Sequence, residues 1–474
     1  MSSTLCQCRV SQEVAAGTVK LQDLRLTNSA APAIAQAAWN FIWGYPLPIM
    51  GFTMASSLKH GPVNEFQYAS TLSNASSTGV VTPNHDTLYS QVWLDLSEGP
   101  QILSVPPIED RYWLVPFLDE YTNFVTSIGS RLNSPPGEYL IVGPGDQDTA
   151  GFEDSRIIRL PTSIAWVIAR MLVLNDADTE TAYHLTLNYT LSPLLASRPA
   201  SGARDLISSQ IAANVSDAPG AVLNSGPIAF ITALTAKPLP YFESVANIST
   251  AVPPDGGVGI EDTTFVPEAA SLSRADNADI LTPAAALGNA CILASASGTG
   301  SAGNTTSSGW KYNLRTAIFN DDYLYRATTA RGGLGALPPQ EAIYFTATTD
   351  ADGEPLDGSV PHTITFAENP PAGAFWSLSI YNSSNNVFFD NPINRYNIGD
   401  RTPGLVYAPD GSLEIYISVN QPTAAAQASN WLPALAGRYY LVLRLYDPEP
   451  SVLAREYEPP AVEPESSTVA ATRS

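Results

Sequence analysis

Short runs of β-type residues recur in two blocks of the chain, each run lying between clusters of Pro, Gly, Asn and Asp. Runs of about four to eight residues between turn signals are typical of strands, and a series at this spacing favours an antiparallel sandwich. No repeat of fixed period accompanies them, which disfavours solenoids and propellers. The first block contains Ser90–Leu96, Gln101–Val105, Tyr112–Leu118, Asn123–Ile128, Glu138–Val142 and the longer run Ser163–Leu174. The second block contains Ala342–Thr348, His362–Phe366, Phe375–Tyr381, Leu413–Val419 and Tyr439–Tyr446.

Helical patterns lie before, within and between these blocks. An apolar helix is expected over Ala31–Met54, ending near Gly44-Tyr45-Pro46 because proline removes a backbone donor and constrains its predecessor. Further helices are expected over Thr179–Leu191, Ile228–Leu234 and Ala284–Leu293. The sequence therefore predicts a mainly β protein with interspersed helices.

Composition suggests where these parts begin and end. Residues 195–309 are rich in Ala, Ser and Pro and finish in a Ser/Gly-rich stretch, while the end of the chain is acidic and Pro-rich. We expect five segments: a poorly ordered N-terminus (1–30), a helix with the first sandwich (31–194), a helical connector (195–309), the second β domain (310–448) and a mobile acidic tail (449–474).

The charge balance argues against some classes of binding partner. The chain has 23 Lys and Arg against 45 Asp and Glu, a formal net charge of −22, and such a surface repels nucleic acid and anionic membranes. Three cysteines make neither a disulfide framework nor a zinc pair. We see no transmembrane run and no signal peptide, and the compartment and oligomeric state stay open. Six Asn-x-Ser/Thr sequons permit glycosylation: Asn74, Asn188, Asn214, Asn247, Asn304 and Asn382.

The densest polar cluster is the stretch from Asn84 to Tyr89. In a structural interpretation, Asn84 and Asp86 terminate a loop by bonding their own backbone, and Tyr89 packs inward. In a functional interpretation, Asp86 is a general acid or base, Tyr89 donates a hydrogen bond and Asn84 contacts a substrate.

A second group follows along the same sheet, with Arg111 and Asp119 near the two ends of one strand, then Tyr121, and Arg131 beyond the next strand. A buried arginine–aspartate pair joining two hairpins is one interpretation. The alternative is an anion site in which Arg111 or Arg131 binds a carboxylate.

Two features of the second block also have alternative interpretations. Phe375–Tyr381 alternates large apolar with small polar residues, which indicates a strand with one wet face; Trp376 then either packs in the core or lines a ligand pocket. Asp350, Asp352 and Asp357 resemble calcium ligands, but their spacing does not match an EF-hand loop and fits a hairpin turn better. No Gly-x-Ser-x-Gly, Walker or His-Glu-x-x-His motif occurs in the sequence.

Several strings together resemble the family built from two paired domains of unknown function, numbered 1254 and 1214. They include Asn84-x-Asp86-Thr87-Leu88-Tyr89, Asp119-x-Tyr121 and Ile128-Gly129-x-Arg131 in the first half, and Phe375-Trp376-Ser377-Leu378 and Leu443-Arg444-Leu445-Tyr446 in the second. The resemblance implies two β-sandwich-like domains, the second jelly-roll-like, with helices between them. It also implies that members are often exported and mostly lack a settled activity.

Three hypotheses of function follow. The leading one is a protein that binds a small organic molecule, with a carboxylate as a candidate, and acts without a cofactor as an isomerase, cyclase, lyase or hydrolase of specialised metabolism. Its catalytic groups are Asp86, Tyr89 and Tyr121, and its substrate contacts are Asn84, Arg111, Asp119, Arg131 and Trp376. The rivals are an exported or envelope-associated binding protein and a calcium-stabilised sandwich.

Overall fold

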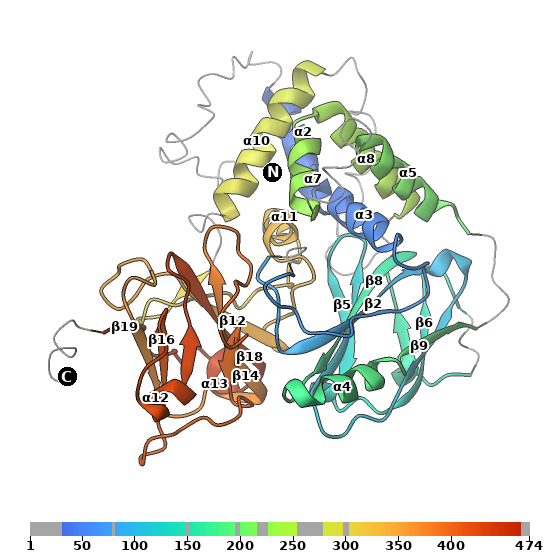
Figure 1. Ribbon diagram of the computed structural model, residues 1–474. Coiled ribbons are helices and arrows are strands. Elements are labelled where there is room, and N and C mark those ends of the chain that lie inside the picture. Colours follow the sequence, from blue (N-terminus) through green and yellow to red (C-terminus); the bar gives the residue numbers. More distant parts are fainter. Residues whose placement is uncertain are drawn as a thin grey trace.

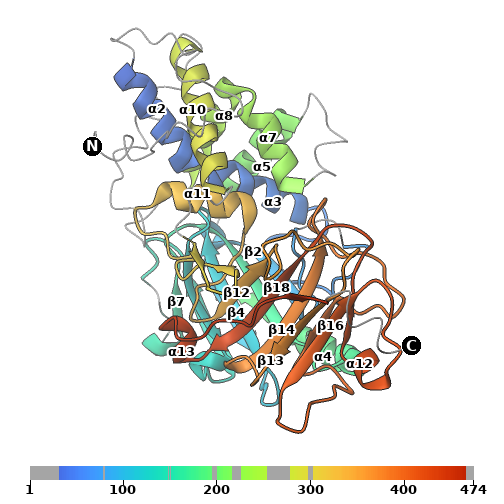
Figure 2. The ribbon, with the colours of Figure 1, turned by 90° about the vertical axis from the view of Figure 1, so that its left-hand side faces the viewer.

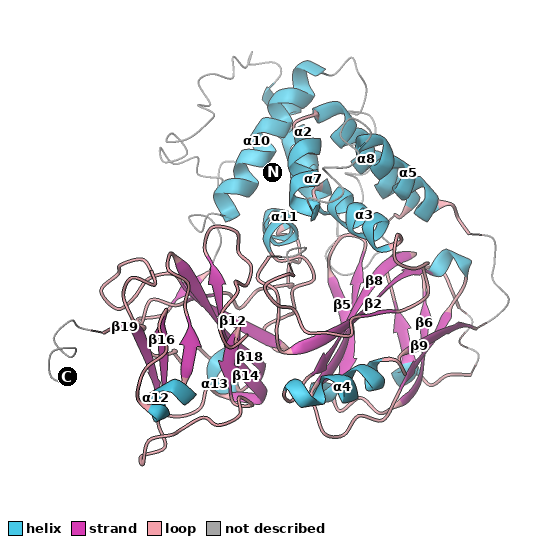
Figure 3. Ribbon diagram, in the orientation of Figure 1, coloured by secondary structure: helices cyan, strands magenta, loops and turns pink. Residues whose placement is uncertain are grey.

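The computed structural model describes residues 31–77, 81–147, 149, 151–194, 200–215, 226–253, 278–296 and 303–465. The segment 1–30, expected to be poorly ordered, lies outside them. The described residues form 19 strands in four sheets, together with a group of helices. Two β domains lie side by side and the helices gather over one end of them (Figures 1 and 3). The predicted mainly β class with helices is confirmed.

The first β domain is a sandwich of two sheets. The five-stranded sheet has the order β1 (Gln67–Tyr68), β2 (Thr87–Asp95), β8 (Ile164–Leu172), β4 (Trp113–Asp119) and β5 (Phe124–Gly129), all antiparallel. The four-stranded sheet has the order β7 (Ile157–Arg159), β6 (Gly137–Val142), β3 (Gln101–Val105) and β9 (Thr190–Pro193). Helix α4 (Thr179–Thr186) precedes β9 and is shorter than predicted, because the chain returns to the sheet at Thr190.

Alternation along β2 and β8 assigns their side chains to two different cores. Leu88, Val92 and Leu94 of β2 point between the two sheets of the sandwich, where they join side chains of β3 and β6. Trp93 of β2 and Trp166 of β8 point to the opposite face and stack on each other with ring centres 5.6 Å apart. Because successive strand residues face opposite sides, the five-stranded sheet is buried on both faces.

The second β domain is also a sandwich. Its six-stranded sheet has the order β10 (Asn304–Thr305), β11 (Lys311–Tyr312), β12 (Ala342–Ala347), β18 (Tyr439–Pro448), β14 (Ala372–Asn382) and β15 (Asn397–Gly399). Its four-stranded sheet has the order β17 (Trp431–Pro433), β16 (Leu413–Ser418), β13 (His362–Phe366) and β19 (Glu463–Pro464). The short helix α12 (Ala425–Ser429) packs on β16, and α13 (Pro450–Leu453) follows β18. The predicted strands of both blocks are present.

Two expectations for this domain are wrong. The stretch 449–465, expected to be mobile, is packed: Val452 and Val462 are buried in the sandwich core and β19 pairs with β13. The expected wet face of β14 is dry, since Ser377 and Ser379 are both fully buried. The physical reason for the second correction is that this face of the sheet packs against the first sandwich.

The helices form one layer although they are scattered in sequence (Figure 2). They are α2 (Ala31–Gly44), α3 (Pro46–Ser57), α5 (Ala203–Val215), α7 (Gly226–Thr235), α8 (Pro238–Ala251), α10 (Ala278–Ala296) and α11 (Tyr323–Gly332). The predicted break at Tyr45-Pro46 separates α2 from α3. Trp93 and Trp166 of the five-stranded sheet belong to the same apolar core as these helices. Within the described residues, only Asp279–Ala296 of α10 has the length and hydropathy of a membrane span, and α10 packs on α2, α8 and α11.

Candidate functional site

The two sandwiches meet through the faces of their larger sheets that point away from their own cores. An apolar cluster that includes Tyr112, Leu172, Phe375 and Tyr446 crosses this junction. Next to it lies a cross-strand pair from each side: Tyr89 opposes Arg170 in the first sheet, and Tyr344 opposes Arg444 in the second. We define the arginine–tyrosine cluster as Tyr89, Tyr112, Arg170, Tyr344, Arg444 and Tyr446.

Arg170 is buried in this cluster. Its Nη2 donates to the carbonyl of Gly335 at 2.9 Å, and its Nε has no hydrogen-bond partner among the described residues. The guanidinium lies over the ring of Tyr89, 5.5 Å from the centroid. Burial lowers the pKa of Arg170, but the hydroxyl groups of Tyr89, Tyr344, Tyr446 and Tyr112 raise it, and the net shift is upward. Arg170 is therefore a full positive charge inside the junction.

Arg444 is the corresponding charge on the other sheet. Its Nη1 donates to Ser379 Oγ at 2.8 Å and its Nη2 to the carbonyl of Thr82 at 3.1 Å. Its guanidinium lies 6.0 Å from the ring centre of Tyr344 and 5.6 Å from that of Tyr381. Among the described residues, no acidic oxygen lies within 4.0 Å of the nitrogens of Arg170 or Arg444.

The tyrosines of the cluster supply hydroxyl protons. Burial raises the pKa of Tyr446 well above its usual value, and the nearby hydroxyls of Tyr344 and Tyr89 add to this shift. Asn84 Nδ2 donates to Tyr446 Oη at 2.7 Å, so this hydroxyl oxygen already accepts a hydrogen bond. Tyr446 therefore remains protonated at neutral pH and has a proton to donate.

Asp86 bridges the two sandwiches beside this cluster. Its side chain is fully buried and accepts from Ser377 Oγ at 2.6 Å, Asn397 Nδ2 at 2.8 Å and Arg401 Nη2 at 2.7 Å. Asn84 Oδ1 accepts from the backbone N–H of Asp86 at 2.6 Å, the local bond expected of a loop terminus. Both carboxylate oxygens of Asp86 thus already accept hydrogen bonds from the second sandwich.

Glu341 makes a second buried bridge between the sandwiches. Here the carboxylate belongs to the second block and the donors belong to the first. Its carboxylate accepts from Tyr112 Oη at 2.7 Å and from Arg131 Nε at 2.7 Å. Arg131, predicted as an anion anchor, is therefore paired with an acidic side chain of the second block.

The remaining predicted site residues lie elsewhere. Arg111 is buried and pairs with Asp110 at 2.8 Å and Asp178 at 2.6 Å, and not with Asp119. Trp376 points into the core of the second sandwich, where its indole N–H has no acceptor among the residues that the structure describes. Asp119 and Tyr121 lie in the turn between β4 and β5, beneath the helices. The structure thus brings Asn84, Asp86, Tyr89 and Arg131 to the junction. Arg111 lies at its edge, where its Nη1 donates to the carbonyl of Leu172 at 3.5 Å, and Asp119, Tyr121 and Trp376 lie away from it.

Arg170 and Arg444 are missing from the predicted site. Each stands alone in a run that is otherwise apolar, within Ser163–Leu174 and Tyr439–Tyr446. A charged residue inside a strand that reads as buried on both faces is costly, so its presence there was the available signal.

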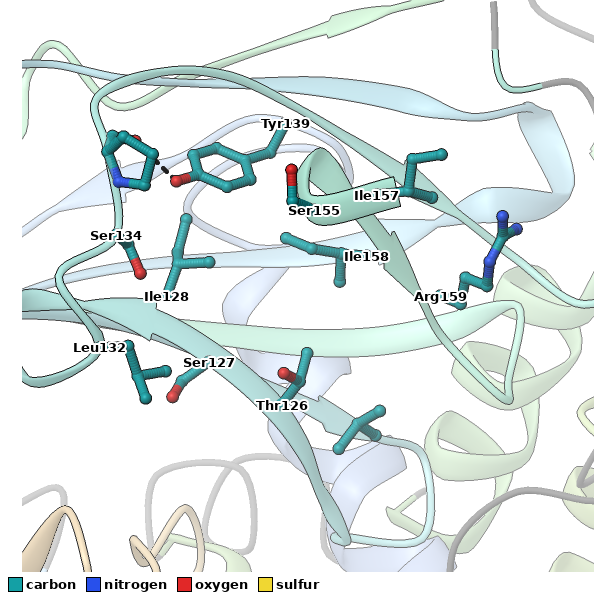
Figure 4. Close-up of a pocket in the computed structure, with 12 residues that line it drawn as sticks. Thr126, Ser127, Ile128, Leu132, Ser134, Tyr139, Ser155, Ile157, Ile158 and Arg159 are labelled. Atoms are coloured by element: carbon teal, nitrogen blue, oxygen red, sulfur yellow. Dashed lines mark hydrogen bonds between the residues drawn. The ribbon is translucent and has the colours of Figure 1, made fainter. Parts of the chain in front are cut away.

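A cavity of about 500 Å³ opens at the edge of the first sandwich, between β5 and β6 (Figure 4). Thr126, Ser127 and Ile128 line one side and Ile158 another, and the hydroxyl of Tyr139 donates to the carbonyl of Pro135 at 2.6 Å. Its one charged lining residue, Arg159, is 54% exposed in its side chain. This cavity therefore lacks the buried charges that distinguish the junction.

The acidic turn of the second block has a local explanation. Asp350 Oδ1 accepts from the backbone N–H groups of Asp352 and Glu354, and Asp357 Oδ1 from that of Ser359. The part of the chain that the structure describes contains no group of three or more His, Cys, Asp or Glu side chains arranged for a metal ion.

The chain matches two family models and is similar to solved structures. The family model "Protein of unknown function (DUF1254)" matches residues 63–193, and "Protein of unknown function (DUF1214)" matches residues 341–450. No curated protein matches the chain. The structure is similar to the crystal structure of the VPA0106 protein from Vibrio parahaemolyticus, with a TM-score of 0.64 and 22% identity over 92% of this chain and 100% of that one. An uncharacterised protein from Burkholderia cenocepacia gives a TM-score of 0.40 and 10% identity over 98% of this chain and 97% of that one.

Proposed function

The chain belongs to the family that pairs the domains of unknown function 1254 and 1214, and we propose that it binds a small organic carboxylate at the junction of its two sandwiches. Arg170 and Arg444 anchor the carboxylate, and the hydroxyl groups of the arginine–tyrosine cluster donate to it. The family descriptions assign no activity, so the proposal depends on the residues of this chain.

The observation that carries the proposal is the pairing of charges in the junction. Asp86 is bonded to Arg401, and Glu341 to Arg131, whereas among the described residues neither Arg170 nor Arg444 forms an ion pair with an acidic side chain. The charge of Asp86 is near enough to raise the pKa of Arg444, so Arg170 is the arginine that lacks a counter-charge. A buried charge without a counter-charge costs several kcal/mol, and proteins rarely retain one without a purpose. The planar guanidinium group fits a carboxylate through two parallel hydrogen bonds, so a ligand of this class compensates the cost.

The same arrangement is compatible with turnover without a cofactor. A tyrosine hydroxyl that burial keeps protonated can donate a hydrogen bond to a bound substrate, and Tyr446 and half-buried Tyr89 flank Arg170. In this proposal Asp86 acts as a positioning residue, since both of its oxygens already accept bonds from the second sandwich.

The test uses the full chain and pairs of probes that differ only in charge: acetate against acetamide, and benzoate against benzamide. We expect a carboxylate, and not its amide, to bind by calorimetry and to raise the melting temperature. Arg170→Met and Arg444→Met are expected to abolish this binding. The control is Arg159→Met, which removes a 54% exposed arginine on the other sheet of the first sandwich and is expected to retain it.

Stability without ligand distinguishes a binding role from a structural one. If Arg170 is retained for a ligand, replacing the unpaired buried charge by a side chain of similar length should leave the free energy of unfolding unchanged or raise it by about 1–4 kcal/mol. A Met variant that is destabilised and binds the probes normally, or a wild type that binds none of the carboxylates, contradicts the proposal.

A further inference from the structure

The cavity at the edge of the first sandwich runs along β5. This strand ends the five-stranded sheet: it pairs with β4 on one side and with no described strand on the other. Four consecutive residues of β5, from Val125 to Ile128, line the cavity of about 500 Å³ (Figure 4). Because successive strand residues face opposite sides of a sheet, a cavity that touches all four lies along the open edge of the strand.

The main chain of β5 points out of this edge at every second residue. At Gly129 the N–H group donates to Ser134 Oγ at 3.0 Å, and the carbonyl accepts from the N–H of Ser134 at 3.1 Å, so both groups point away from β4. The pairing with β4 is regular from Gly129 back to Thr126, and hydrogen-bonding direction alternates along a strand. The N–H and carbonyl groups of Ser127 therefore also point away from β4. This agrees with the residue opposite Ser127, which is Pro116 and has no N–H to donate.

The main-chain groups of Ser127 are left without partners at this edge. Ser127 is only 6% exposed and lines the cavity, and no described residue beyond the edge forms a hydrogen bond with its N–H or carbonyl group. Nearly all buried main-chain donors and acceptors in proteins are paired, because an unpaired one is costly. A donor and an acceptor on one strand residue are the groups that a residue of an added strand pairs with.

The wall of the cavity at Ser134 and Pro135 is held in place by its own contacts. The carbonyl of Pro135 accepts from Tyr139 Oη at 2.6 Å and from Arg156 Nη1 at 3.0 Å, and the carbonyl of Pro136 accepts from Arg156 Nη2 at 3.1 Å. The guanidinium of Arg156 lies over the Tyr139 ring, 4.7 Å from its centroid. A site that is already formed without its ligand loses less freedom on binding.

The chemistry of the lining favours an uncharged ligand with an apolar side chain. Ile128 and Ile158 are buried apolar residues of the lining, and Thr126 and Ser155 add hydroxyl groups (Figure 4). The described lining contains no acidic side chain, and its arginine, Arg159, is more than half exposed to water. A charged ligand would therefore find no buried counter-charge in this cavity.

We propose that this edge binds a short, uncharged, extended peptide segment, which adds a strand beside β5. The carbonyl and N–H groups of one peptide residue pair with the N–H and carbonyl groups of Ser127, and an apolar side chain of the peptide packs on Ile128 and Ile158. The segment is short because Ser134 already occupies the outward groups of Gly129 and so ends the free edge. This site shares no residue with the arginine–tyrosine cluster and does not depend on the proposed function.

The experiment measures binding of capped tripeptides to the full chain by calorimetry at millimolar peptide. The probes are N-acetyl-Ala-X-Ala-amide, with Val, Leu or Phe as X, and they carry no charge that the arginines of the junction could attract. We expect at least one of them to bind. Each N–H group of the best tripeptide is then methylated in turn. Because alternate N–H groups of a strand face its partner, methylating the central residue and methylating its two neighbours are expected to have opposite effects: one weakens binding at least about fivefold and the other leaves it unchanged.

A pair of substitutions at Ser127 tests the role of its main chain. Ser127→Pro removes the outward N–H group and leaves the pairing with β4 intact, as proline does at such positions of edge strands. Ser127→Ala loses the same hydroxyl group and keeps the N–H group. We expect Ser127→Pro to weaken binding of the best tripeptide at least about fivefold and Ser127→Ala to bind it as the wild type does.

A second pair tests the cavity without changing the strand. Ser155→Trp places a large ring at an exposed position of the lining and is expected to abolish binding, whereas Ser192→Trp, at an exposed position of β9 on the opposite edge of the four-stranded sheet, is expected to retain it. The proposal is overturned if none of the tripeptides binds, if all three methylated forms bind equally, or if Ser127→Pro binds as tightly as Ser127→Ala. Equal binding by the two tryptophan variants also overturns it, as does a crystal grown with the best tripeptide that contains only water beside Ser127.

Discussion

Replacing Asp86 by alanine should weaken the interaction between the two sandwiches, so that they no longer unfold in one transition. The substitution removes the acceptor of Ser377, Asn397 and Arg401, of which Ser377 is fully buried and Arg401 is only 20% exposed in its side chain. Breaking a buried ion pair from one side costs about 3–5 kcal/mol, because the other charge is left uncompensated. Since a typical domain is stable by about 5–15 kcal/mol, the loss is a large fraction of the total.

Urea denaturation followed by tryptophan fluorescence measures this loss. We expect Asp86→Ala to lower the free energy of unfolding by about 3–5 kcal/mol and to split the transition in two, as the sandwiches no longer unfold together. Asp86→Asn retains an acceptor oxygen and should lose less. The control is Asp110→Ala, which removes an ion-pair partner that is 61% exposed and should cost less than about 1 kcal/mol.

Two results would refute this reasoning. Equal losses in Asp86→Ala and Asp110→Ala would show that the bridge does not couple the sandwiches. An Asp86→Asn variant of unchanged stability that no longer binds the carboxylate probes would show that Asp86 acts in ligand binding and does not join the sandwiches.

Three further predictions concern other parts of the molecule. Burial raises the pKa of Asp119 to about 6, so the folded state binds this proton more tightly than the unfolded state and loses up to about 3 kcal/mol of stability as pH rises from about 4 to 6. Asp119→Asn should remove this loss, measured as the free energy of unfolding at several pH values, and Asp410→Asn, at an exposed turn, should retain it. Gly335 has φ +74° and a Cβ there would lie 3.2 Å from a tryptophan ring, so by thermal denaturation Gly335→Ala should be less stable than Gly404→Ala, a control with φ +79° in open space that costs about 1–2 kcal/mol. Val462→Ala should lower the stability of the second sandwich by about 1–3 kcal/mol in the same assay, and a change near zero would mean that the end of the chain does not stabilise the core.

The sequence predicted most of the strands because each lies between turn-forming residues that act locally. It could not predict which strand faces meet. Ser377 and Ser379 suggest a wet face, since small polar residues usually face solvent, yet tertiary packing buries them against the first sandwich. Val462 was missed for a similar reason: a Pro-rich acidic composition describes the segment as a whole, whereas one valine and a two-residue strand attach it to the core.

The candidate site was predictable only in part, because local patterns in the sequence do not show which residues tertiary packing brings together. Asn84 and Asp86 stood out because polar residues cluster in sequence there, and the structure brings them to the junction. Arg170 and Arg444 are separated by more than half of the chain. Each opposes a tyrosine within its own sheet, and only the packing of the two sheets against each other brings both arginines to the junction. Glu120 lies between two residues that were singled out, but nothing local reveals that its carboxyl oxygens have no hydrogen-bond partner in the described part of the chain.

The helices of the layer come from distant parts of the sequence, and this affects how the protein folds while the ribosome makes it. The first sandwich is complete once β9 has emerged, but the helices that cover Trp93 and Trp166 end only at α11. At about 5–20 residues per second, the ribosome needs roughly 10–30 s to make the intervening stretch. During that interval an apolar sheet face is open to water, which makes this half-finished protein a substrate for chaperones and the point at which its production is most exposed to aggregation.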